Sequence, residues 1–223
     1  MNSKLVFQAI SKLLLGIVFI AALLFIPAGS LKYFQAWLFM GILFVPMLAA
    51  GVIMMLKSPG LLKKRLNNKE EQTEQKLVIA LSAVMFLAAF ILAGLSFRFS
   101  WFMLPTWASY IACAVFLFAY ALYFEVLKEN EYLSRTVEVQ ENQKVVDTGL
   151  YGIVRHPMYM STVLLFLSMP LVLCSTVSFI IMLFYIPIII MRIKNEEKVL
   201  EQGLEGYSEY KKKVKYRLIP FIW

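Results

Sequence analysis

Four ionisable residues flank one long apolar run and could together form a ligand-binding pocket at a membrane surface. Arg155 and His156 precede the run 157–191, whereas Arg192 and Glu196 follow it. If that run folds back as a hairpin, its two ends return to the same surface and these side chains converge. Arg192 and Glu196 are four residues apart and share one face of a helix. Ionisable residues at a membrane boundary are functional candidates.

Each of these residues also has a purely structural interpretation. Arg155 could be a membrane-interface anchor whose charge reaches toward water. His156 could be a loop residue at the helix start. Arg192 and Glu196 could be an ordinary helical ion pair, worth roughly 0.2–0.5 kcal/mol, and Glu197 points about 100° away from Glu196 on the same helix. The order of these residues along the chain, taken together, favours a shared pocket.

The sparse histidine and cysteine content excludes several kinds of catalytic site. The chain has one histidine and two cysteines, so a zinc site of the His/Cys type is not available. A Cys/His nucleophile pair is disfavoured for the same reason. The ten glycines are scattered, and no glycine-rich phosphate loop occurs. Cys113 falls within an expected span and Cys174 at an expected outer turn, and nothing indicates that they pair.

Membrane helices are the elements that must position these side chains. Hydrophobic residues make up 61% of the chain and charged residues 16%, against roughly 45–50% and 25% in soluble domains. The chain contains five stretches without charged residues. A membrane span needs roughly 20 apolar residues, and each of the first four stretches has the length of one span. The last would measure about 52 Å as one helix, so we predict a hairpin that turns near Cys174-Ser175-Thr176. The charge-free stretches are 13–31, 33–56, 77–97, 99–124 and 157–191.

The predicted fold class is therefore an all-α integral membrane protein with about six transmembrane helices, the last two forming a helical hairpin. Residues 1–127 form a four-span N-terminal membrane region. Residues 128–223 carry the polar motifs, the hairpin and a C-terminal cytoplasmic helix. The first apolar run could instead be a signal peptide. Its length and the weak cleavage site at Pro27–Ser30 favour a retained helix.

The distribution of basic residues predicts the orientation. In the six-span arrangement, all lysines and arginines except Lys32 and Arg98 fall on the side of the N-terminus. The positive-inside rule places that side, with both termini, in the cytoplasm. The net charge of +8 is then a signal for orientation and for anionic membrane lipids. No nucleic-acid partner is indicated, because no basic stripe is interleaved with aromatic residues on a soluble face.

Three segments outside the spans have local patterns of their own. Residues 58–75 could contain a short interfacial helix built on Leu61, Leu62 and Leu66, or could be a solvated charged loop. Thr136–Val139 alternates in a way that suggests a short extended piece. Residues 192–203 continue the last helix out of the membrane, and residues 207–215 are amphipathic and basic.

The motifs of residues 120–223, in this order, resemble the isoprenylcysteine carboxyl methyltransferase family, including its bacterial and archaeal relatives. The most specific feature is the pair formed by the two motifs on either side of the hydrophobic hairpin. The residues that carry the resemblance are Asn130-Glu131-Tyr132-Leu133-Ser134-Arg135-Thr136-Val137, Gly149-Leu150-Tyr151, Arg155-His156-Pro157-Met158-Tyr159, Arg192 with Glu196-Glu197 and Leu200, Tyr207 with Tyr210, and Pro220-Phe221-Ile222.

The resemblance implies a cofactor pocket on the cytoplasmic side for S-adenosyl-L-methionine. It implies that Arg192 contacts the substrate, and that Arg192, Glu196 and Glu125 are the catalytic candidates. No metal is implied. The residues implied to contact the cofactor are Gln140, Gln143, Lys144, Val145, Val146, Tyr151, His156, Pro157, Met158, Tyr159 and Glu196.

The chemistry of methyl transfer is compatible with these residue types. A carboxylate acceptor has a pKa near 4 and is already ionised at neutral pH, so no general base is needed. The enzyme must align donor and acceptor, and alignment can lower a barrier by roughly 7–11 kcal/mol. Arg192 would hold the acceptor carboxylate by paired hydrogen bonds, and Glu196 would bind the cofactor's ammonium or a ribose hydroxyl. Tyr151 or Tyr159 could place a ring face beside the sulfonium.

We therefore expect methyl transfer to a membrane-associated lipidic acceptor, most simply O-methylation of a carboxylate such as that of a prenylcysteine. The expected partners are a lipidic or prenylated small molecule and membrane lipids, and the expected location is a bacterial or archaeal plasma membrane. Alternatives within the class are a phospholipid amine N-methyltransferase and a thiol S-methyltransferase. Alternatives of other classes are a sterol-type double-bond reductase and a non-enzymatic scaffold or small transporter.

Overall fold

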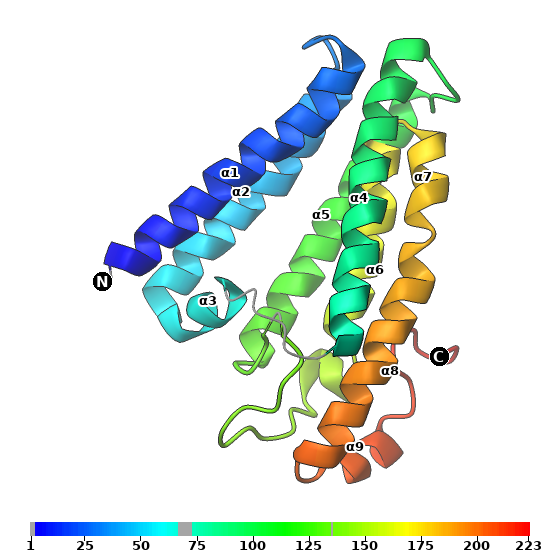
Figure 1. Cartoon of the computed structure of the whole chain (residues 1–223). Helices are drawn as coiled ribbons and strands as arrows, with labels where there is room; N and C mark the ends of the chain where they lie inside the picture. Colours follow the sequence, from blue (N-terminus) through cyan, green and yellow to red (C-terminus); the bar gives the residue numbers. More distant parts are fainter. Residues whose placement is uncertain (1–2, 67–72, 135) are drawn as a thin grey trace.

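The computed structural model describes residues 3–66, 73–134 and 136–223, and within them the chain is helical with no named strand. Five helical segments are long and apolar enough to cross a membrane, counting α7 and α8 as one, and α6 is a shorter apolar helix (Figure 1). The predicted all-α membrane architecture is confirmed. Lys69 and Arg135 lie outside the described residues. The helices are α1 (Ser3–Ala28), α2 (Phe34–Lys57), α3 (Pro59–Leu66), α4 (Thr73–Phe99), α5 (Thr106–Glu129), the 3₁₀ turn η1 (Gly149–Gly152), α6 (Pro157–Val172), α7 (Thr176–Met182), α8 (Tyr185–Gly203) and α9 (Tyr207–Lys213).

The last apolar run folds back on itself, as predicted. The chain reverses at residues 173–175, between α6 and α7. Cys174 takes a left-handed conformation with φ of 55°. Ser175 then caps α7, because its Oγ accepts a hydrogen bond from the backbone N–H of Ser178 at 3.2 Å. The fold-back brings the start of α6 and the end of α8 to the same end of the molecule (Figure 1).

The return arm of the hairpin is interrupted between α7 and α8. The break falls at Leu183 and Phe184, four and three residues before Pro187. A proline has no N–H to pair with the carbonyl four residues earlier, and its ring clashes with that carbonyl. Pro187 therefore explains why the arm is two helical segments.

Buried hydroxyl groups tie the hairpin turn to the other helices. Tyr33 donates to the carbonyl of Leu173 at 2.6 Å. Ser109 of α5 donates to the carbonyl of Val172, also at 2.6 Å. Backbone carbonyls that have no helical partner need another donor inside a membrane. These bonds fix the turn of the hairpin. The opposite ends of α6 and α8 are positioned from there, and the end of the molecule at which they lie is called the inner end.

Helices α1 and α2 pack on the rest of the bundle through one end only. The buried side chains of α1 are Leu24, Phe25 and Ala28, and those of α2 do not extend past Phe44. Helix α4 approaches α1 so closely that a Cβ on Gly94 would lie 2.6 Å from the carbonyl oxygen of Leu24. Toward their other ends, α1 and α2 incline away from α5 (Figure 1).

The loop after α2 contains the short helix that was one of the two predicted alternatives. Helix α3 buries Leu61 and Leu62 and presents its basic residues on other faces. Lys12 of α1 donates to the carbonyl of Leu66 at 2.6 Å. This bond ties the end of α3 to α1, and Arg65 of α3 contacts the hydroxyl of Tyr123 of α5.

The C-terminal part closes over the inner end of the hairpin. Helix α8 ends at Gly203, as predicted, and α9 follows. The tail then returns to the start of α6, where the N–H of Arg155 pairs with the carbonyl of Tyr216 at 2.9 Å and that of His156 with Arg217 at 2.8 Å. The expected extended piece at 136–139 is irregular chain without strand pairing.

Candidate active site

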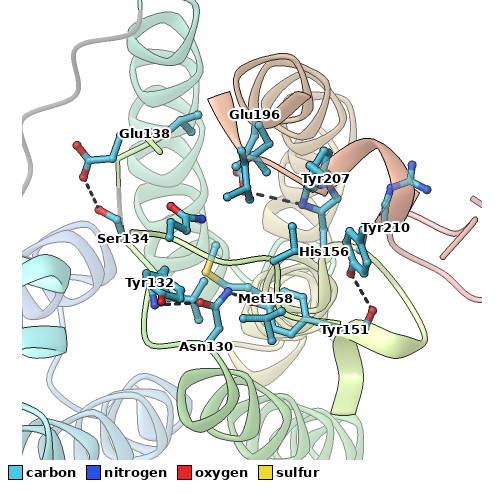
Figure 2. Close-up of a pocket in the computed structure, with 18 of the residues that line it drawn as sticks. Asn130, Tyr132, Ser134, Glu138, Tyr151, His156, Met158, Glu196, Tyr207 and Tyr210 are labelled. Atoms are coloured by element: carbon cyan, nitrogen blue, oxygen red, sulfur yellow. Dashed lines mark hydrogen bonds and ion pairs between the residues drawn. The ribbon is translucent and has the colours of Figure 1, made fainter. Parts of the chain in front are cut away.

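A pocket lies where the inner ends of α5, α6 and α8 meet the segment 130–146 and α9 (Figure 2). The space between its walls is about 820 Å³, including the part open to solvent. Ten of the sequence-predicted residues line it: Gln143, Lys144, Val145, Val146, Tyr151, His156, Met158, Tyr159, Arg192 and Glu196.

Three predicted residues are placed elsewhere. Gln140 does not line the pocket but shapes the loop beside it, since its Nε2 donates to the carbonyl of Tyr132 at 2.5 Å. Pro157 is the first residue of α6, where its missing N–H has no helical partner to lose. Glu125 lies outside the pocket lining on an exposed face and pairs with Lys128 at 2.7 Å.

The hairpin brings Arg192 and Glu196 onto a tyrosine of the opposite arm. Tyr159 of α6 donates a short hydrogen bond to Glu196, and Arg192 Nε donates to the Tyr159 hydroxyl at 2.9 Å. The Arg192 guanidinium also lies over the Tyr159 ring, 5.8 Å from its centroid. Arg192 and Glu196 are thus joined through Tyr159. A cation and a carboxylate are held side by side on the pocket wall.

Glu197 is the electrostatic centre beneath the pocket. Its carboxylate accepts from Arg155 Nε and from Arg217 Nε, each at 2.8 Å, and lies 3.3 Å from His156 Nε2. Glu197 is 3% exposed and Arg155 is 6% exposed. Arg155 also donates to the carbonyls of Val214 and Lys215. Arg155 is therefore a buried link between the segment before α6, helix α8 and the C-terminal tail, and the interface-anchor interpretation is wrong.

This arrangement holds His156 at the base of the pocket. Nδ1 of His156 lies 4.0 Å from Glu196 Oε1, while Nε2 faces Glu197. The imidazole stacks on the Tyr159 ring with centroids 5.7 Å apart. His156, Tyr159 and Glu196 consequently form one contiguous polar wall.

Tyrosines and an asparagine form the other side of the pocket. Asn130 Nδ2 donates to the Tyr151 hydroxyl at 3.0 Å, and the Tyr210 hydroxyl donates to the Tyr151 carbonyl at 2.8 Å (Figure 2). Burial raises the pKa of Tyr151, Tyr207 and Tyr210, so all three stay protonated at neutral pH. All three tyrosines are buried.

The Tyr207 hydroxyl is buried in the pocket wall without a hydrogen-bond partner among the described residues. An unpaired buried hydroxyl costs about 1–3 kcal/mol. We therefore expect Tyr207→Phe to leave the melting temperature of the ligand-free protein unchanged or to raise it. The matched variant Tyr210→Phe removes a hydroxyl that is bonded, and should lower the melting temperature. Thermal melts in detergent compare the two, and an equal loss in both would contradict the assignment.

Sequence patterns gave no role to several residues of this site. The sequence shows that Glu197 follows Glu196, but it does not predict that the Glu197 side chain is buried. Asn130, Tyr132 and Tyr207 line the pocket and had appeared only as parts of motifs. Arg217 has no local signal, because nothing in its spacing separates it from the other cations of the basic tail.

The described residues contain no group of three or more His, Cys, Asp or Glu side chains that could hold a metal.

Residues 110–202 match the family described as Isoprenylcysteine carboxyl methyltransferase (ICMT). This region is similar to the ICMT family, and the match covers less than half of the chain. It runs from α5 through the hairpin into α8, and so contains most of the pocket wall, including Tyr159, Arg192 and Glu196. The match supports a membrane methyltransferase, and the apolar helices are those of a multi-pass membrane protein. Beyond the matched residues, Tyr207 and Tyr210 of α9 complete the pocket lining, and Arg217 pairs with Glu197.

A second similarity is to a protein of another named activity. The Delta(14)-sterol reductase of Mus musculus is 26% identical over 91 residues, which cover 40% of this chain and 22% of that protein. The chain thus spans about a fifth of the length of the curated relative it matches. This similarity adds a reductase to the functions that the ICMT region must be distinguished from.

Proposed function

We propose that this protein transfers a methyl group from S-adenosyl-L-methionine to a carboxylate on a lipidic acceptor such as a prenylcysteine. The observation that supports this proposal most is the convergence of Arg192 and Glu196 with Tyr159 and His156 in one pocket of the ICMT region. The pocket offers a cation, a carboxylate and aromatic faces within reach of one another. Those are the groups that would bind an acceptor carboxylate, a cofactor ammonium and a sulfonium.

The residues of the pocket fit the cofactor by chemical type. S-adenosyl-L-methionine supplies an electrophilic methyl group on a sulfonium. Glu196 would accept from an ammonium or a ribose hydroxyl, and the ring of Tyr151 or Tyr159 would face the positive sulfur. The chain from Gln143 to Val146 would close over the cofactor.

The protein's task in the reaction is to hold two reactants in line. Arg192 would orient the acceptor carboxylate by two N–H groups of its guanidinium. Tyr159 would hold the Arg192 side chain in place, because its hydroxyl accepts from Nε. The carboxylate is ionised at neutral pH, so no side chain needs to remove a proton. The apolar flanks of the pocket would keep water from the methyl group.

The distribution of basic residues along the chain supports an orientation of the pocket in the membrane. Positive residues predominate on the side of this pocket, so we place the pocket and both termini on the cytoplasmic side of a bacterial or archaeal plasma membrane. A cytosolic cofactor then reaches the pocket from water and a lipidic acceptor from the bilayer. Glu125 would act only indirectly, since it lies outside the pocket.

Calorimetric titration of the detergent-purified protein with S-adenosyl-L-methionine tests the proposal. We expect saturable binding that Glu196→Gln and His156→Ala weaken by roughly tenfold or more, since a charge-assisted hydrogen bond contributes about 1.5–3 kcal/mol. Glu201→Gln, on the exposed part of α8, is the matched control and should bind like the wild type. Absence of binding by the wild type would contradict the proposal.

A double-bond reductase is the second candidate, on the single ground of the sterol reductase similarity. It requires a nicotinamide cofactor. The same titration with NADPH separates the two, because a reductase would bind NADPH tightly and S-adenosyl-L-methionine weakly or not at all. A methyltransferase would show the reverse.

A further inference from the structure

A mostly apolar groove lies between α2, α3 and α5. Its walls are mostly apolar, and Ser58 and two lysines also line it. The lining residues are Ile53, Met54 and Lys57 of α2, Ser58, Leu61 of α3, and Phe124, Leu127 and Lys128 of α5. It lies on the part of α2 beyond Phe44, where the helix no longer buries side chains against the bundle. A groove of this composition fits a hydrocarbon chain.

Arg65 stands between this groove and the cofactor pocket. It is in the last turn of α3, one turn beyond Leu61. Its Nη1 lies 3.3 Å from the carbonyl oxygen of Ser134 and 3.8 Å from Met158 Sδ, and both residues line the pocket. Its Nη2 contacts the hydroxyl of Tyr123, whose neighbour Phe124 lines the groove.

The charge of Arg65 is not neutralised within the described part of the chain. The side chain is half-buried, and each contact that it makes there is with a neutral group. Arg155 and Arg217, by contrast, share the carboxylate of Glu197. A partly desolvated guanidinium without an anion binds a carboxylate well, because the hydrogen bonds are charge-assisted and can be paired.

We propose that Arg65 binds the carboxylate of the acceptor as its hydrocarbon chain occupies the groove between α2, α3 and α5. This inference rests on the proposed function and adds a second arginine to acceptor recognition. Arg65 selects acceptors that carry a carboxylate on an apolar chain, and it holds them at the wall of the pocket. Arg192 then orients the carboxylate for methyl transfer.

The role of Arg65 predicts a change in binding without a comparable change in turnover at saturation. An interaction made equally in the bound state and in the transition state alters KM but not kcat. Arg65→Gln should therefore raise KM for an S-prenylcysteine by about tenfold to a hundredfold and leave kcat within about threefold. Lys63→Gln, an exposed residue of the same helix, should change neither.

A pair of ligands separates recognition of charge from damage to the fold. Binding of an S-prenylcysteine and of its carboxamide is measured in lipid nanodiscs by thermophoresis, for wild type, Arg65→Gln and Arg65→Lys. We expect Arg65→Gln to weaken carboxylate binding by at least tenfold and carboxamide binding by less than twofold. Arg65→Lys, which keeps the charge, should retain part of the wild-type preference for the carboxylate.

Three results would overturn the assignment of Arg65. One is equal weakening of both ligands, which would mean a structural role only. Another is an Arg65→Gln variant that still prefers the carboxylate. The third is observed with the wild-type protein alone, so it does not depend on whether a variant folds. It is equal binding of the two ligands, or preferential binding of a phosphate-headed lipid with the same hydrocarbon chain. If the wild type binds S-adenosyl-L-methionine but Arg65→Gln behaves like wild type, this inference fails and the proposed function stands.

Discussion

Arg192→Ala should reduce kcat for methyl transfer by at least a hundredfold while cofactor affinity stays within a few-fold. The guanidinium lies on the pocket wall, hydrogen-bonded to Tyr159 and adjacent to Glu196. In the proposed mechanism it orients the acceptor rather than the donor. Loss of alignment costs rate because positioning is the main contribution that a protein makes to such a displacement.

Single-turnover rates with saturating acceptor, together with calorimetry for S-adenosyl-L-methionine, measure the two effects separately. Arg192→Lys is the first control, since it keeps the charge but not the planar pair of donors, and its rate should fall between those of wild type and Arg192→Ala. Tyr159→Phe is the second, because it removes the hydroxyl that connects Arg192 to Glu196 and keeps the ring. A collapse of cofactor affinity in Arg192→Ala would show that Arg192 serves the cofactor instead.

Glu197→Gln should destabilise the folded protein by about 3–5 kcal/mol. The carboxylate is 3% exposed and is shared by Arg155 and Arg217, with His156 beside it. The amide of glutamine has nearly the same shape but cannot neutralise Arg155, which is itself buried. An uncompensated buried charge is costly because desolvation is no longer offset.

Melting temperatures in detergent measure this effect, and the expected loss corresponds to roughly 6–20 °C for a chain of this size. Glu201→Gln is the matched control, one turn further along α8, where the carboxylate pairs with Lys211 and both side chains are 37% exposed. An exposed pair contributes at most about 1 kcal/mol. If the two variants melt within about 2 °C of each other, Glu197 is not the centre of the buried network.

The membrane architecture could be predicted because it depends on properties local to the chain. The length of an apolar run decides whether a helix can span a membrane. The run at 157–191 is too long for one span, and charged residues bound it at both ends. Its reversal near Cys174 follows from that length alone. The break before Pro187 is equally local, although its effect on the hairpin was not predicted.

The candidate site was predictable where motifs flank the hairpin and was not where distant segments meet. His156, Tyr159, Arg192 and Glu196 line one pocket because the hairpin returns them to one end. Gln140 and Glu125 lie outside its lining, since loop path and helix face decide which way a side chain points. Arg217 and Arg65 come from parts of the chain in which their neighbours are also basic, so residue type could not single them out.

The amino-acid sequence by itself determined the helical spans, the hairpin and the residues at its two ends, because hydropathy and run length act along the chain. Only the tertiary structure decided that Glu197 is buried among cations, that α9 and the tail close the pocket, and that Arg65 lies between groove and pocket. Burial and ion pairing depend on which segments come together in space, and 42 residues of chain separate Arg155 from Glu197.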